Sequence, residues 1–156
     1  MWYAQSFINS NIDQTVNMMT GVSGSLKIWV NDQLVIREED ERNTDLDVYN
    51  STVKLHKGYN RILVQVGSSE ISRSNFMIRL LNTSGDPLNN ITYSAAYQPY
   101  SKETDFKPVS IPLFAEQYFI SKTKEKKNEF TDRLMLAETY MKNEKILEAS
   151  KALEAI

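Results

Sequence analysis

Residues 24–36 read GSLKIWVNDQLVI, and this stretch predicts a tight antiparallel hairpin. Every second position of its first half is apolar: Leu26, Ile28 and Val30. This alternation is the period of a strand with one buried face. Asn31-Asp32 follows directly, where a two-residue turn needs side chains that tolerate positive φ.

The alternation also assigns the side chains around the turn to faces. Leu34 and Ile36 are expected to resume the buried face, whereas Trp29 falls on the opposite face beside Lys27. Large aromatic side chains are buried more often than displayed. Trp29 therefore either packs beneath a loop or the C-terminal helices, or forms a platform on which a sugar ring stacks.

Strand-like patterning continues on both sides of the hairpin, from Trp2 to about Ser94. Separate strands are expected at 2–7, 15–19, 26–30, 34–36, 53–55, 61–66, 76–80 and 88–93. The fold class is therefore mainly β, an antiparallel β-sandwich or jelly roll of about eight strands with a C-terminal α-helical hairpin.

The period changes after a segment that contains three of the four prolines, which lies at about 95–112. The expected organisation is a sandwich at 1–96, a linker at 97–111 and a helical region at 112–156. Ser110 is expected to cap the first helix. Two later helical stripes are expected: Phe130, Leu134, Ala137 and Met141, and then Ile146, Ala149, Leu153 and Ile156.

The composition excludes several classes of protein and site. The net charge of −2 provides no basic field for nucleic acid, which is not expected as a partner. Without cysteine the chain has no disulfide, no thiolate nucleophile and no cysteine-based zinc site. No apolar run is long enough to span a bilayer. With a single histidine and no nucleophile-elbow motif, the chain is not expected to be an enzyme.

The β half resembles the galactose-binding-like jelly rolls, including the sugar-binding-type domains of β-galactosidases and β-glucuronidases. Those domains carry a hairpin of the type VWVNG, to which Ile28-Trp29-Val30-Asn31-Asp32 corresponds, with Asp32 in place of the usual Gly. They also carry a later strand pair, whose counterparts here are Val53, Leu55, Gly58, Asn60, Leu63, Val64 and Val66. The resemblance implies the fold and carbohydrate as the ligand class.

The C-terminal helices resemble the opening of a tetratricopeptide repeat. Ala137, Tyr140, Ala149 and Leu153 stand at the spacings of that repeat, with Glu144 where the turn usually has Gly. Such repeats need neighbours to bury their faces. The resemblance therefore implies a fragment of a larger bacterial multidomain protein, with other domains or a protein partner at the helical region. Such a parent is expected to be extracytoplasmic, either periplasmic or at the cell surface.

Two groups of side chains are candidate site residues. For a ligand, these are Trp29, Tyr49 and Tyr59. For calcium, the only cofactor considered, they are Glu39, Asp40, Asp45 and Asp47, which lie in or after the acidic run 38–41. This run is expected in a loop, where a solvated cluster without metal is the alternative.

The sequence thus supports two functional hypotheses. The first is a non-catalytic binding module, with carbohydrate as ligand, within a larger protein. The second is a structural domain that orients helical repeats or a missing catalytic domain through protein contacts. Exposure of Trp29 would favour the first, and its burial under the helices would favour the second.

Overall fold

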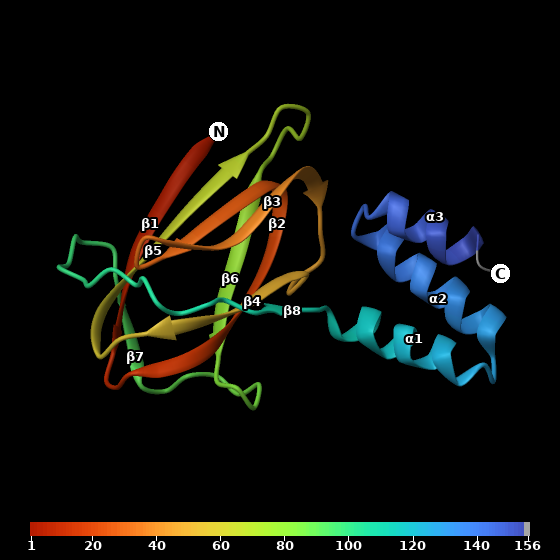
Figure 1. Cartoon of the computed structure of the whole chain (residues 1–156). Coiled ribbons are helices and arrows are strands. Elements are labelled where there is room, and N and C mark those ends of the chain that lie inside the picture. Colours follow the sequence, from red (N-terminus) through yellow and green to blue (C-terminus); the bar gives the residue numbers. More distant parts are fainter. Residues whose placement is uncertain (155–156) are drawn as a thin grey trace.

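The computed structural model describes residues 1–154, which form strands followed by helices (Figure 1). In chain order the elements are β1 (Trp2–Ser10), β2 (Gln14–Val30), β3 (Gln33–Asn43), β4 (Tyr49–Leu55), β5 (Gly58–Gly67), β6 (Asn75–Leu81), β7 (Ile91–Ser94), β8 (Ser110–Ile111), α1 (Phe114–Glu125), α2 (Glu129–Lys142) and α3 (Ile146–Glu154). The protein is therefore mainly β with a helical extension, as predicted, although the extension has three helices instead of a hairpin.

Strand β2 connects the two layers of the sandwich because it contributes to each of them. Its first half pairs with β4 and β6, and its second half pairs with β3 and β5. β1 joins β5, β7 joins β1, and β8 joins β4, all antiparallel. The eight strands thus form one sheet that folds through β2 into a layer β7-β1-β5-β2-β3 and a layer β8-β4-β2-β6.

The fold point of β2 lies at Gly21–Gly24. The prediction of separate strands at 15–19 and 26–30 was wrong, because one 17-residue strand spans both. Gly24 has φ +135°, and the register between β2 and β3 shifts just after it. A bulge of this kind allows a strand to turn from one layer into the other.

The hairpin that opens the sequence is largely as predicted. Ile28 and Val30 are buried in the core, and Asn31 and Asp32 form the turn with φ values of 50° and 67°. Leu34 is an exception, since it is 40% exposed. A second register shift, between Ile28 and Trp29, sets Leu34 opposite Trp29 on the outer face.

The proline-containing segment 97–111 is held against the sandwich and is not a free linker. The Tyr100 hydroxyl donates to Asp32 Oδ1 (2.8 Å), and the Glu103 N–H donates to the Asn31 carbonyl (2.9 Å). Ser110 belongs to β8, where it pairs with Ser51. The prediction that Ser110 caps a helix was therefore wrong, and α1 begins four residues later, at Phe114.

Glu103 anchors this segment through a buried carboxylate, whose side chain is 5% exposed. Oε2 lies 3.3 Å from Lys54 Nζ and 3.0 Å from His56 Nε2, and Asp13 Oδ1 lies 3.7 Å from the other His56 nitrogen. Oε1 accepts three backbone hydrogen bonds, from Thr104, Asp105 and Phe106. The backbone donors, with the N–H of Asp105 contributing most, and Lys54 lower the Glu103 pKa to about 2.

The protein should therefore lose the stabilising contribution of the Glu103 carboxylate in acid. Its pKa is lower in the folded than in the unfolded state, so its contribution is full above pH 4.5 and is lost as pH falls toward 2. We expect wild type to exceed Glu103→Gln in unfolding free energy by up to about 3 kcal/mol at neutral pH. Urea unfolding at several pH values measures this difference, and a gap that does not narrow between pH 5 and 2 would contradict the assignment.

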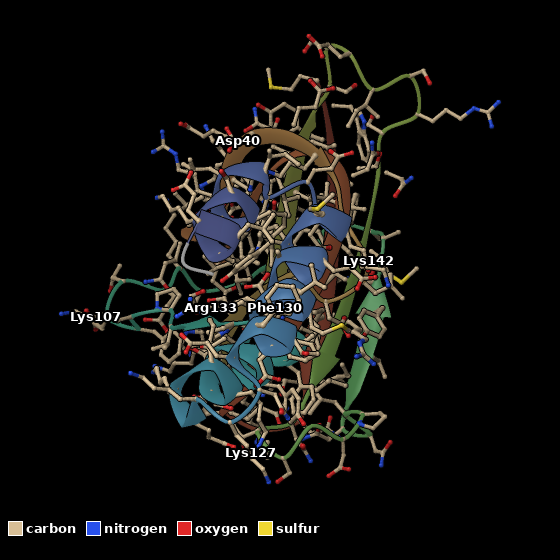
Figure 2. All side chains as sticks on the ribbon, turned by 90° about the vertical axis from the view of Figure 1, so that its right-hand side faces the viewer. Asp40, Lys107, Lys127, Phe130, Arg133 and Lys142 are labelled. Carbon is tan, nitrogen blue, oxygen red and sulfur yellow. The ribbon has the colours of Figure 1, made fainter. Side chains whose placement is uncertain are left out.

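The helices form their own small core from Leu136, Ala137, Ala149 and Ala152. The first predicted stripe is only partly buried: Ala137 is 1% exposed, whereas Phe130, Leu134 and Met141 are 63%, 46% and 57% exposed. In the second stripe Ala149 is buried, Ile146 and Leu153 are exposed, and Ile156 lies outside the described residues. Figure 2 views the helices from the side away from the sandwich and shows Phe130 on α2.

The turn between α2 and α3 contacts the end of β3 and the β3–β4 connection. The Asn43 N–H donates to Glu144 Oε2 (2.7 Å), and the Asp45 N–H donates to Asn143 Oδ1 (3.0 Å). Asn143 is 2% exposed, and Glu144 has φ 54°, the left-handed conformation for which the repeat pattern uses Gly. These contacts join the helices to the sandwich. No helix within residues 1–154 has the length and hydropathy needed to cross a membrane.

Candidate binding surfaces

Trp29 lies on the outer face of the β7-β1-β5-β2-β3 layer. Its neighbours across the ladders are Leu34 on β3 and Leu63 on β5. The side chain is half-buried and belongs to neither of the two hydrophobic clusters. Trp29 also does not line the cavity between the sandwich and the helices. Trp29 is therefore a half-buried ring on an outer strand face, outside both cores.

Polar side chains flank Trp29 on the same face. Lys27 lies opposite Gln65, which in turn lies opposite Tyr3 on β1. Gln65 Nε2 donates to the Tyr3 hydroxyl (2.8 Å), and Tyr3 is 58% exposed. Gln5, opposite Leu63, accepts a hydrogen bond from Arg61 Nε. We call Tyr3, Gln5, Lys27, Trp29 and Gln65 the Trp29 surface.

The other two tyrosine candidates do not join this surface. Tyr59 stands four residues before Leu63 on β5, a separation of about 13 Å along the strand. Tyr49 is 7% exposed and belongs to the core cluster, although its hydroxyl lies 3.4 Å from Arg42. Burial raises the pKa of Tyr49. The structure thus separates Trp29, Tyr49 and Tyr59.

The acidic run lies in β3 instead of the predicted loop, so its side chains alternate between faces. Of the predicted calcium ligands, Glu39 contacts Arg37 (2.5 Å) and Asp40 contacts Arg42 (2.6 Å). Asp47 pairs with Arg79, and Asp45 is exposed. Within residues 1–154 no group of three or more His, Cys, Asp or Glu side chains is arranged to hold a metal ion.

Glu41, in the same run, closes the loop that follows β5. Its carboxylate accepts hydrogen bonds from the Ser69 hydroxyl and from the backbone N–H groups of Ser69, Glu70 and Ile71. These bonds, led by the Ser69 hydroxyl, lower the pKa of Glu41 to about 2. Glu41 thus holds the loop at 67–74 against β3.

A polar cleft of about 470 Å³ lies between the sandwich and the helices. Strand residues from β3 and β4 form one wall, and Glu116 of α1 with Lys145 and Glu148 forms the other. Tyr49 also lines it, so the one tyrosine candidate that is buried still reaches a cavity. This cleft was not predictable from the sequence, because its two walls are far apart in the chain.

Comparison of the chain with protein-family models, with curated proteins and with solved structures gives no match. The Trp29 surface and the polar cleft are therefore interpreted from their own chemistry. The partners of Trp29 on that surface were missed by sequence reasoning. Tyr3, Gln5 and Gln65 stand at outward-facing strand positions, but only the pairing register shows that they share the face of Trp29, with Gln65 on the adjacent strand β5 and Tyr3 and Gln5 one strand further away on β1.

Proposed function

We propose that the protein is a non-catalytic binding module whose Trp29 surface binds carbohydrate. The single observation that carries the proposal is the position of Trp29, which is half-buried on an outer strand face and lies in neither hydrophobic cluster. An aromatic ring fixed in this way offers a flat apolar area to the C–H face of a sugar. Extracytoplasmic placement in a larger bacterial protein, where glycans are met, belongs to the same proposal.

The neighbours of Trp29 complement its ring chemically. Lys27, Gln5 and Gln65 supply amide and ammonium donors, and the two glutamines also supply acceptors. Tyr3 adds an exposed aromatic ring to the half-buried ring of Trp29. A saccharide with several hydroxyl groups needs this mixture of stacking surface and polar groups, as pockets for small ligands generally do.

The proposal predicts loss of glycan binding in Trp29→Ala with the fold retained. On a glycan array the wild type should bind a restricted set of sugars, and Trp29→Ala should lose about tenfold or more in affinity. Leu34→Ala removes the apolar neighbour from the same face and is the matched control, with a much smaller expected loss. Circular dichroism establishes folding of each variant. Equal binding by Trp29→Ala would eliminate this surface as the site.

A scaffold role is the second candidate, and the exposed side of α2 favours it. Phe130, Leu134 and Met141 form an apolar stripe beside the α2–α3 contact. We propose that a further antiparallel helix packs there and continues the stacking of α1, α2 and α3. The contacts of Asn143 and Glu144 with the β3–β4 connection would then fix the direction in which such helices extend.

This second candidate predicts that the stripe is dispensable for folding. Replacing Phe130, Leu134 and Met141 together by Gln should leave the unfolding free energy within about 1 kcal/mol of wild type. Leu136→Gln is the buried control on the same helix and should cost about 3 kcal/mol. Urea unfolding measures both. A triple variant as unstable as the control would place the stripe in the folded core and remove the argument for a docking face.

A further inference from the structure

The polar cleft between the sandwich and the helices contains two carboxylates that form no salt bridge within residues 1–154. The cleft is lined by three basic and three acidic side chains. Each base already has a carboxylate partner: Arg37 pairs with Glu39 (2.5 Å), Arg42 with Asp40 (2.6 Å) and Lys145 with Glu116 (2.6 Å). Of these partner carboxylates only Glu116 is itself part of the lining, so two lining acids remain, Glu38 and Glu148.

Glu38 and Glu148 lack a direct ion-pair partner in the part of the chain that the structure describes, although the charges of Arg42 and Lys145 act on Glu38 from a longer distance. Neither forms a salt bridge within residues 1–154, and neither carboxylate accepts a hydrogen bond there. Glu148 Oε2 is shielded from solvent and has no hydrogen-bond partner. A buried carboxylate oxygen in this state costs free energy that a cation would recover.

The two carboxylates face a common space, although they come from β3 and α3. Burial raises the pKa of Glu38; the positive charges of Arg42 and Lys145 oppose this shift, and the negative charges of Asp40 and Glu148 add to it. The rest of the lining includes the apolar side chains Val35, Ile111 and Leu113. A ligand that matches this lining has a positive end for the carboxylates and an aliphatic stem for the apolar wall.

We propose that the cleft binds an organic cation, a primary ammonium or guanidinium group on an aliphatic stem, between Glu38 and Glu148. Such a group donates several hydrogen bonds and can satisfy two carboxylates at once. The shared chemistry is that of a lysine or arginine side chain and of a free alkylamine. This site is separate from the Trp29 surface and does not depend on carbohydrate binding.

The test is a titration of the whole chain with small probes, followed by amide chemical shifts at residues 38, 49 and 148. The probes are Nα-acetyl-lysine methylamide, Nα-acetyl-arginine methylamide and pentylamine. Nα-acetyl-norleucine methylamide has a similar stem without the charge and is the control ligand. We expect saturable shifts with at least one cation, none with the norleucine derivative, and weaker binding at high salt. Pentylamine binding as strongly as the amino-acid probes would identify a free amine as the simplest ligand.

Variants decide whether the two carboxylates form the site. Glu38→Gln and Glu148→Gln should each weaken cation binding by about tenfold or more. Glu138→Gln removes an exposed glutamate of α2 and should leave binding unchanged. If Glu148→Gln does not fold, the cation affinity of Glu38→Gln, on the other wall of the cleft, still tests the proposal. Unchanged affinity in the folded variants, equal binding of the norleucine derivative, or no saturable shift with any cation up to about 20 mM would overturn the proposal.

Discussion

Asn60→Ala should destabilise the protein by about 4 kcal/mol, among the largest effects of any single substitution. Asn60 is fully buried, and its side chain joins three parts of the chain. Oδ1 accepts hydrogen bonds from the His56 N–H (2.8 Å) and from Asn31 Nδ2 (2.8 Å). Nδ2 donates to the carbonyls of His56 (2.7 Å), Gly58 (3.0 Å) and, on β1, Ile8 (3.4 Å). Truncation leaves these buried groups without partners.

The loss should spread from Asn60 to the hairpin turn. Asn31 is also fully buried, and its Oδ1 accepts the Arg61 N–H (2.9 Å). Guanidinium unfolding of Asn60→Ala measures the cost. Asn11→Ala removes an exposed asparagine and should change stability by less than about 0.5 kcal/mol. A cost below about 1 kcal/mol for Asn60→Ala would show that the buried pair is not a structural link.

Gly24→Ala should cost a comparable amount, about 4 kcal/mol, for a different reason. Its φ of +135° lies in a region that side chains rarely adopt. An added Cβ would also lie 2.6 Å from the Gly67 carbonyl oxygen and 3.0 Å from Val66 Cγ1. Because the oxygen belongs to the backbone of β5, relief requires the two strands to separate at the fold point of β2.

Gly85→Ala separates the cost of the positive φ from the cost of the steric clash. Gly85 has φ +92°, and a Cβ there would meet no atom within 4 Å. We expect it to lose only about 1–2 kcal/mol, the backbone part of the effect. Thermal unfolding of both variants measures the difference. If Gly24→Ala were no worse than Gly85→Ala, the close approach of β2 and β5 at this point would be refuted.

The local features of the fold were predictable, whereas those that depend on pairing were not. Asn31-Asp32 defines its turn by residue type, and the alternation at Leu26, Ile28 and Val30 gives the buried face. The continuity of β2 was not predictable, because Gly21-Val22-Ser23-Gly24 has the composition of a turn. Tertiary pairing with four other strands overrides that local preference.

The candidate sites show the same division. Trp29 was assigned to the outer face from the alternation alone, but its neighbours required the register of β1 and β5. The acidic run was expected in a loop, because charge runs favour solvated segments. In the structure it forms an edge-strand region of β3 in which Arg37 and Arg42 pair with Glu39 and Asp40 two residues away. The ion-pair partner of a charged side chain in this run cannot be predicted until it is known that the run forms a strand.

The most direct test of the Trp29 surface is the indole N–H resonance of Trp29 during titration with oligosaccharides. Trp2 serves as an internal control, because its indole nitrogen donates to Ser74 and its ring packs against Phe76. Neutral and acidic oligosaccharides containing glucose, galactose, mannose or glucuronate are added in turn. A saturable shift of Trp29, with Trp2 unchanged, is the predicted result. No shift of Trp29 with any of these glycans, or equal shifts of both tryptophans, would contradict the account.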